Sequence, residues 1–173
     1  MKYLKYLIYI LKHKWYVFIE CWKLGIPLKG VLHDLSKFLP SEFKAYTDKY
    51  FGNENEFKEL EKIELNFLKA WNHHQKRNKH HPEYWIMHKE EEQKIFEMPL
   101  IYRKEMLADW KGASKAKGYG GDILTWYKRR RKKIPLAPKT RRWIEKQIGF
   151  ENRPHQLRIP IGELVDCDLR ENN

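Results

Sequence analysis

The stretch VLHDLSKF, residues 31–38, places a histidine, an aspartate and a lysine in an otherwise apolar run that predicts a buried helix. Burying such groups is costly unless each has a partner. A cation bound by His33 and Asp34 would be a partner for both, because coordination bonds replace the lost hydration. The alternative interpretation of these two residues alone is an aspartate at a helix terminus beside a hydrogen-bonded core histidine.

Helical periodicity continues along most of the chain, and strand-like alternation is almost absent before the last residues. Glycine and proline divide the sequence into segments of helix length. We predict one all-α domain over residues 1–150, followed by a short extended C-terminal tail over residues 151–173. A chain of 173 residues can bury one core without disulfides. The predicted helices are 3–24, 28–38, 41–51, 55–77, 83–96, 99–117, 122–133 and 138–148.

The first 28 residues are the most apolar part of the chain, but lysines recur through them. No uninterrupted apolar stretch approaches the roughly 20 residues that a membrane span needs. We therefore expect no span, and we favour an amphipathic helix in a soluble domain over a helix lying on a membrane surface. Cys21 and Cys167 form no CxxC pair, which favours a reducing cytoplasm, that of a host if the gene is phage-encoded.

The chain carries a net charge of +12, and the excess is concentrated late in the sequence. Residues 123–144 include no acid, and nine basic residues extend from Lys128 to Arg142. With Trp126, Tyr127 and Trp143 interleaved, this tract could follow a phosphate backbone. A non-catalytic nucleic-acid-binding module is therefore one alternative function, and a solvated basic face without a ligand is the other interpretation of the tract.

Two further polar residues lie where helical faces should be apolar. His13 is midway along the first predicted helix, and Asp109 lies in EMLADWKGAS, residues 105–114. With His33 and Asp34 they supply four ligands, enough for a helical cage with room left for water. This mixed set of nitrogen and oxygen donors suits Mn, Fe, Co, Ni or Zn better than Mg.

The order of these four residues resembles that of the HD superfamily of metal-dependent phosphohydrolases. In that superfamily a His, a His-Asp pair and a later Asp, all on helices of one bundle, hold the metal. His13, His33 with Asp34, and Asp109 match this order. HDLSK is also similar to an HDxxK variant whose lysine meets a substrate phosphate, so the resemblance implies that role for Lys37. It implies an HD-like helical bundle as well.

A closer resemblance is to a phage and bacterial family of HD-like proteins known only as a domain of unknown function. It spans most of residues 10–148. It implies the fold without implying a substrate. The stretches that carry it are HDLSKFLPSEFKAY, AWNHHQKRNKHHPEYW, EMLADWKGASK and LAPKTRRWIE.

HD proteins with cyclic-dinucleotide phosphodiesterase activity have a tandem His pair before the final Asp, and this pair helps to bind a second metal. His73 and His74 resemble that pair in order and spacing. Those enzymes also have a histidine between the HD pair and the tandem pair, whereas residues 35–72 contain none. We therefore expect one ion, and His73 and His74 allow a second.

Further candidate catalytic residues follow from the same region and from spacing. Without a second ion, His73, His74 and His81 could donate hydrogen bonds to phosphate oxygens or to a leaving group. His80 is an alternative to His81 in this role, and the other interpretation of both residues is that they cap a helix end before Pro82. Glu105, four residues before Asp109 on the same helical face, could orient a water or hold a ligand imidazole. Its alternative role is an exposed partner for a lysine.

These features predict a metal-dependent phosphomonoesterase or phosphodiesterase acting on a nucleotide or another small phosphorylated substrate, through a water activated by the metal. A di-iron HD-type oxygenase is a second enzymatic alternative, because the surplus histidines could hold two irons. The sequence predicts no oligomeric state.

Overall fold

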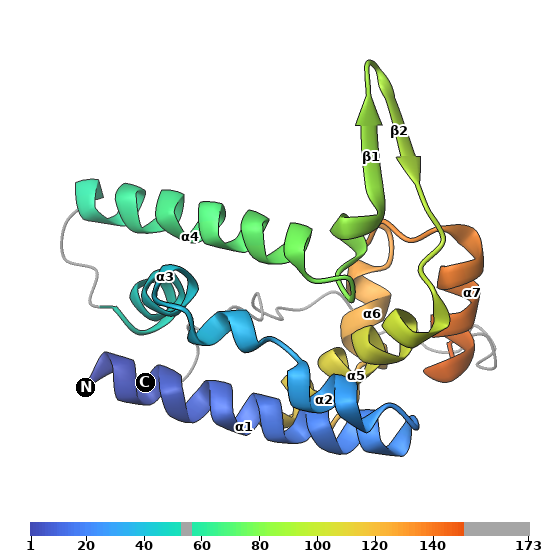
Figure 1. Cartoon of the computed structure of the whole chain (residues 1–173), viewed down its shortest axis with the longest axis horizontal. Coiled ribbons are helices and arrows are strands. Elements are labelled where there is room, and N and C mark those ends of the chain that lie inside the picture. The colour runs from blue at the N-terminus through green and yellow to red at the C-terminus, as the bar shows by residue number, and fades with distance from the viewer. Residues whose placement is uncertain (53–56, 151–173) are drawn as a thin grey trace, which may run out of the picture.

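A computed structural model describes residues 1–52 and 57–150, so the expected C-terminal tail lies outside the described residues. The described part is predominantly helical, which confirms the all-α class (Figure 1). Its α-helices are α1 (Lys2–Lys23), α2 (Pro27–Leu32), α3 (Pro40–Phe51), α4 (Phe57–Arg77), α5 (Leu100–Ala116), α6 (Leu124–Arg130) and α7 (Pro138–Gln147). A short 3-10 helix, η1 (Leu35–Phe38), precedes α3. A second one, η2 (Pro82–Trp85), precedes a hairpin of β1 (Ile86–Lys89) and β2 (Glu92–Ile95).

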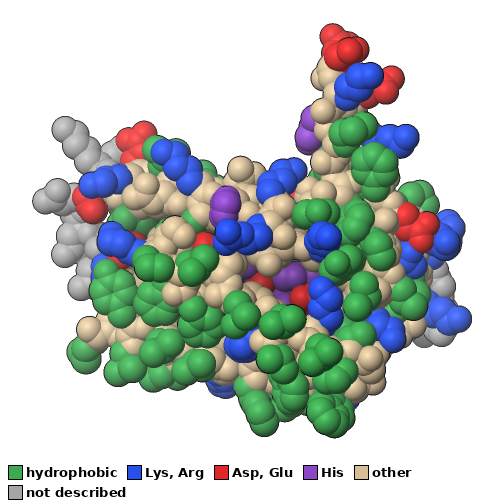
Figure 2. Space-filling model, viewed as in Figure 1, with side chains coloured by type: hydrophobic (Ala, Val, Ile, Leu, Met, Phe, Trp, Pro, Cys, Tyr) green, Lys and Arg blue, Asp and Glu red, His purple; other side chains and the backbone are tan. Residues whose placement is uncertain are grey.

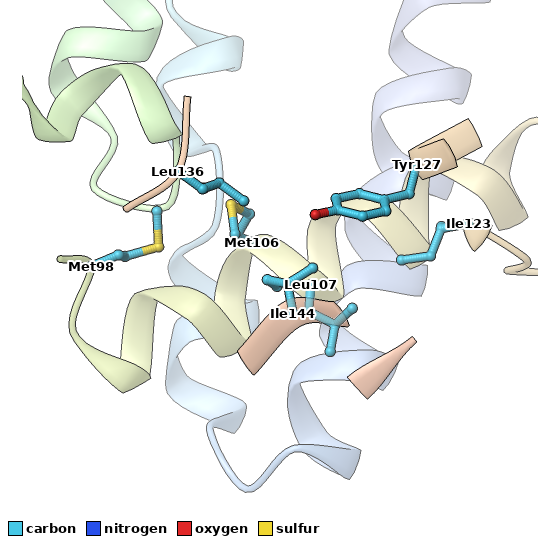
Figure 3. Packing of buried hydrophobic residues seen from close by; sticks show 7 residues of the cluster. All are labelled: Met98, Met106, Leu107, Ile123, Tyr127, Leu136 and Ile144. Atoms are coloured by element: carbon cyan, nitrogen blue, oxygen red, sulfur yellow. The ribbon is translucent and has the colours of Figure 1, made fainter. Parts of the chain in front are cut away.

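Three clusters of buried side chains hold the helices together. One lies between α1, α3 and α4 and is made by Tyr6, Ile10, Tyr46 and Phe67. A second, between α1 and α5, is made by Val17, Cys21 and Ala108. In the third, side chains from α5, α6, α7 and the segments before α5 and α7 point toward one another (Figure 3). The helix α1 therefore links the α3–α4 part of the molecule to the α5–α7 part.

Two glycines allow the helices around α1 to approach closely. A Cβ added at Gly112 of α5 would lie 2.5 Å from Val17 Cγ2, and one added at Gly30 of α2 would lie 2.7 Å from Phe18 Cα. Neither contact is tolerable without movement of the backbone or of a packed side chain. Glycine at these positions therefore brings α2 and α5 against α1.

The predicted helix over residues 28–38 is broken in its middle. The helix α2 ends at Leu32, His33 is extended with ψ 129°, and Asp34 has φ 51°, in the left-handed region. Lys14 of α1 stabilises the break, because its ammonium donates hydrogen bonds to the carbonyls of Val31 (2.6 Å) and His33 (2.9 Å). The side chains of His33 and Asp34 therefore extend from a turn and not from a continuous helix.

The predicted helix over residues 83–96 is wrong, because this segment forms η2 and an antiparallel hairpin. Ile86 pairs with Ile95 and Lys89 with Glu92, and Glu90 makes the turn with φ 54°. Residues 87–94 are all exposed, so the segment has no apolar stripe that a helix could bury. In Figure 1 the hairpin projects away from the helices.

The first helix meets the expectation of an amphipathic element packed in a domain. One side of α1 buries Tyr6, Ile10, His13 and Val17 against its neighbours. Among the helices of residues 1–52 and 57–150, none is long and apolar enough to cross a bilayer.

Candidate metal centre

The four ligands predicted from the sequence meet between α1, α5 and the break that follows α2. His13 Nε2 lies 3.2 Å from Asp109 Oδ1, and His33 Nε2 lies 3.4 Å from the same oxygen. Asp34 Oδ2 is 3.3 Å from His33 Nε2. One donor atom from each of the four residues lies within 4.8 Å of every other. This first donor group has the composition of a cation site with two nitrogens and two oxygens.

A second donor group lies beside the first and shares Asp34 with it. Asp34 Oδ1 is 3.4 Å from Nε2 of both His74 and His80. His81 completes the group, whose donor atoms also lie within 4.8 Å of one another. His74 comes from the last turn of α4, and the other two histidines come from the turn between α4 and η2. Asp34 therefore offers one carboxylate oxygen to each group.

The structure brings His74 and His81 to the centre, but it does not bring His73. Adjacent residues of a helix point about 100° apart, so His73 is exposed when His74 faces inward. The side chain of His73 instead borders a surface cavity of about 520 Å³ between α3 and α4. The expected pairing of His73 with His74 is therefore wrong, and His74 lies instead with His80 and His81. His88 lies exposed on the hairpin.

Two buried glutamates hold the outer nitrogens of three histidines. The Nδ1 atom of His74 lies 2.8 Å from Glu42 Oε2. Glu105 Oε1 lies 3.5 Å from Nδ1 of both His33 and His80. A carboxylate that accepts the Nδ1 proton leaves Nε2 free to bind a metal and fixes the plane of the ring. Glu105 is therefore placed to hold two imidazoles, one of the roles expected for it. Its other oxygen, Oε2, lies 3.2 Å from the ammonium of Lys29, so it also pairs with a lysine, although it is buried and not exposed.

Glu42 and His80 complete the centre. Sequence reasoning did not select Glu42, and it offered His80 only as an alternative to His81. Glu42 follows Pro40 and Ser41, so it had the pattern of an acidic residue in the first turn of a helix. That interpretation is compatible with its position in α3, but Glu42 is only 1% exposed. A glutamate so deeply buried needs a partner, which His74 supplies. The signal for His80 was its place in a second histidine pair.

The polar atoms that face the centre are those that the rest of the protein leaves without hydrogen bonds. Within the described residues, eleven buried side-chain nitrogen and oxygen atoms make no hydrogen bond, and eight of them belong to the two donor groups. Buried polar groups are ordinarily satisfied, so such a concentration indicates a missing partner. A cation fits seven of the eight, which are five imidazole Nε2 atoms and the two carboxylate oxygens of Asp34. The eight atoms are Nδ1 and Nε2 of His13, both carboxylate oxygens of Asp34, and Nε2 of His33, His74, His80 and His81.

The residues of the first donor group shift one another's pKa values strongly when no metal is bound. Burial alone would lower the pKa of His33, but the neighbouring Asp34, Asp109 and Glu105 carboxylates outweigh it and raise the pKa to about 10. Burial would raise the pKa of Asp34 and Asp109, yet the adjacent cationic groups hold both well below the usual range. A proton on His33 therefore occupies, in the absence of metal, the place that a cation would take.

In the second donor group, the pKa values of two histidines shift in opposite directions. Burial and the neighbouring imidazoles of His80 and His74 push the pKa of His81 well below its usual value. Burial also acts on His74, but the Asp34 and Glu42 carboxylates outweigh it and raise the pKa of this histidine. His81 is thus held neutral near pH 7, the form in which histidine binds a metal.

Lys37 lies beside the shared carboxylate. Its ammonium is 2.6 Å from Asp34 Oδ2, and its side chain is 16% exposed. Burial would lower the pKa of Lys37, but Asp34 outweighs this effect and raises the pKa well above its usual value. The lysine is therefore a fixed positive charge at the edge of the donor groups. Figure 2 shows histidine and acidic side chains at the surface in the middle of the face, below the hairpin, with basic side chains around them.

The late basic tract is partly used inside the protein. Arg141 donates hydrogen bonds to the carbonyls of Arg131 (2.8 Å) and Ile134 (2.7 Å), and Arg131 pairs with Glu145 (2.6 Å). The aromatic residues interleaved in the tract, Trp126, Tyr127 and Trp143, pack in or against the α5–α7 core. Seven of the nine basic residues remain exposed, at positions 128–130, 132, 133, 139 and 142. The convergent buried donors therefore lie in the candidate metal centre, whereas the basic tract forms an exposed charged surface.

Comparison with known proteins gives a family but no activity. No curated protein and no solved structure matches the chain. Residues 2–149 match a family described as a family of unknown function, DUF5662, and this range contains both donor groups and the glutamates behind them. With this match over most of its length, the chain belongs to the DUF5662 family.

Proposed function

We propose that the protein is a metal-dependent phosphohydrolase that cleaves a phosphate ester of a nucleotide or another small phosphorylated compound. The observation that carries the proposal is the convergence of buried imidazole and carboxylate atoms without hydrogen-bond partners on two adjacent points that share Asp34. Mixed nitrogen and oxygen donors favour a transition metal such as Mn, Fe, Co, Ni or Zn. When bound, the metal supplies Lewis-acid polarisation of a phosphoryl oxygen and lowers the pKa of a water.

The residues around the donors have separate tasks in this proposal. Glu42 and Glu105 hold the Nδ1 protons of three histidines, so that each ring presents Nε2 to the centre. Lys37 neutralises negative charge on the phosphoryl group, as its ammonium already lies at the edge of the donors. His81, held neutral by burial, is either a ligand or a donor to a phosphate oxygen.

We infer a two-ion centre rather than the single ion that the sequence first suggested. The resemblance to HD phosphodiesterases is more complete when His80 and His81 are taken as the tandem pair and His74 as the histidine that precedes it. The second ion and this reassignment of the histidines are both supported by the second donor group, in which these three residues lie with Asp34. With this assignment, the departure from the HD pattern that residues 35–72 suggested no longer exists.

The test is metal analysis followed by a turnover assay on protein purified without chelator. We expect about two transition-metal ions per chain, and hydrolysis of bis(p-nitrophenyl) phosphate or p-nitrophenyl phosphate that a chelator abolishes and a divalent ion restores. Asp34→Asn should reduce both metal content and turnover, the latter by roughly 100-fold or more, because both donor groups lose a carboxylate oxygen. Nucleotides would then be screened for the preferred ester.

His73→Ala is the matched control, because it removes an adjacent histidine that lies outside both donor groups. Its metal content and turnover should equal those of the unmodified protein. Full metal loading without hydrolysis of any phosphate ester would contradict the proposal. Two irons with the spectroscopic signature of a bridged pair, together with consumption of oxygen, would favour the oxygenase alternative instead.

A further inference from the structure

The first helix has a second apolar side, opposite the one that it buries in the domain. Leu4, Ile8, Leu11, Trp15, Phe18 and Trp22 repeat at alternating steps of four and three residues, which places them along one helical face. Trp15 is 60% exposed and Trp22 is 65% exposed. Most of this stripe therefore contacts solvent rather than the core.

The exposed stripe continues onto the neighbouring segments. Leu28 (77% exposed), Val31 and Leu32 belong to α2, while Leu35 and Leu39 belong to η1 and to the residue that follows it. We call this surface, with the six residues of α1, the α1–α2 apolar face. Figure 2 shows apolar side chains along the lower edge of the molecule, where Figure 1 places α1 and α2. A continuous apolar surface of this kind indicates a binding surface.

The charges around the α1–α2 apolar face are of one sign. Lys5, Lys12 and Lys23 lie exposed along one margin of the stripe. Glu20 and Asp34 are the only acidic residues among residues 1–40, and both are buried. A second copy of the chain would bring these lysines toward one another without acids to pair them. An anionic partner would match them.

We propose that the α1–α2 apolar face docks the protein on the surface of an anionic lipid bilayer. Apolar side chains beside a row of lysines are the composition of a helix that lies in the interface, with Trp15 and Trp22 at the depth where indole rings are favoured. The lysines add attraction to acidic headgroups. The proposal stands independently of the proposed function.

The test is sedimentation of the full chain with lipid vesicles. We expect binding to vesicles of phosphatidylglycerol and phosphatidylcholine in equal parts, weaker binding at high salt, and little binding to phosphatidylcholine alone. Leu11→Glu combined with Trp15→Glu should reduce binding by about tenfold or more, because both apolar contacts are lost and repelled charges replace them. Both residues are more than half exposed, so the variant should keep the helical circular dichroism of the parent.

A matched control replaces two exposed leucines of α4, Leu65→Glu with Leu68→Glu, which are 50% and 49% exposed. This control changes charge and apolar area by similar amounts on a different surface, and its vesicle binding should equal that of the parent. Equal loss in both variants, or no binding to the anionic vesicles, would overturn the proposal. So would a dimer in light scattering that Leu11→Glu converts to a monomer, because a second copy would then cover the face.

Discussion

Asp34 explains at the scale of one residue how two groups of ligands meet. Its φ of 51° turns the chain between α2 and η1, and aspartate tolerates this left-handed conformation better than most residues. The turn lets one carboxylate face His33 on one side, and His74 and His80 on the other. Asparagine can adopt the same backbone without the charge, so Asp34→Asn tests the ligand and leaves the turn intact.

The two glutamates behind the imidazoles should have different effects when each is replaced. Glu42→Gln loosens only His74, so we expect weaker binding of one ion. Glu105→Gln loosens His33 and His80, one in each donor group, so binding of both ions should weaken. Loss of such a supporting carboxylate typically costs roughly 10- to 100-fold in metal affinity. Competitive titration of both variants with a chromophoric chelator measures the effect, and an equal weakening of both ions in Glu42→Gln would contradict the assignment.

At the scale of elements, sequence reasoning succeeded where a helix buries an apolar stripe. The predicted helices 3–24 and 99–117 agree closely with α1 and α5, because each has its own periodic face. The failures have a local cause. A left-handed aspartate broke one predicted helix, and residues 86–95, with good helix-forming residues but no buried face, formed a hairpin.

The same contrast applies to the candidate site. His13 and Asp109 were predictable because each is polar on a helical face that is otherwise apolar. His80 and Glu42 reach the centre through a turn and through the packing of α3 on α4, which periodicity does not encode. His73 and His74 could not be told apart until the orientation of α4 was known. The fold class was therefore more predictable than the second half of the centre.

The spacing between α1 and α5 depends on Gly112, so a single methyl group there should disturb the fold. Gly112→Ala places its Cβ against Val17, and we expect the free energy of unfolding to fall by about 1–3 kcal/mol. Metal affinity should fall with it, because His13 and Asp109 lie on the two helices that are forced apart. Denaturant unfolding measures the first effect.

Val17→Ala in the same chain should recover part of the loss from Gly112→Ala, since it removes the methyl group that the new Cβ meets. The two changes should therefore be non-additive by at least about 0.5 kcal/mol. Strict additivity would mean that the loss comes from the Val17 backbone, whose nitrogen lies 2.9 Å from the added Cβ, and not from Val17 Cγ2.

At the scale of the whole molecule, the centre concentrates charge in a domain that must be stable before any metal arrives. Asp34, Asp109 and Glu105 are ionised near pH 7. Among the described residues, protonated His33 is the one cationic group that lies within 3.5 Å of all three, while Lys37 pairs with Asp34 and Lys29 with Glu105. The protein thus uses a proton to balance carboxylates that are arranged for a cation. Its stability must then depend on pH.

We expect the melting temperature of the metal-free protein to fall as pH rises from 6.5 towards 10. The pKa of His33 in the folded protein, about 10, lies above the ordinary value of 6.5. The stabilisation from its proton is therefore complete below pH 6.5 and is lost as pH rises through the folded pKa. Thermal melts in chelator from about pH 6 to pH 9 measure this slope. His33→Gln should flatten it, and parallel curves for the two proteins would contradict the prediction.

The sharing of Asp34 has a consequence for how this centre can change during evolution. With the proposed two-ion centre, loss of His13 leaves the second donor group complete and loss of His81 leaves the first complete. We therefore expect that either change can leave a centre with one ion. No such halfway stage exists for Asp34, whose replacement impairs both at once. We therefore expect two kinds of relatives. Some retain this aspartate and bind at least one ion, and the others have lost it and retain only the helical fold.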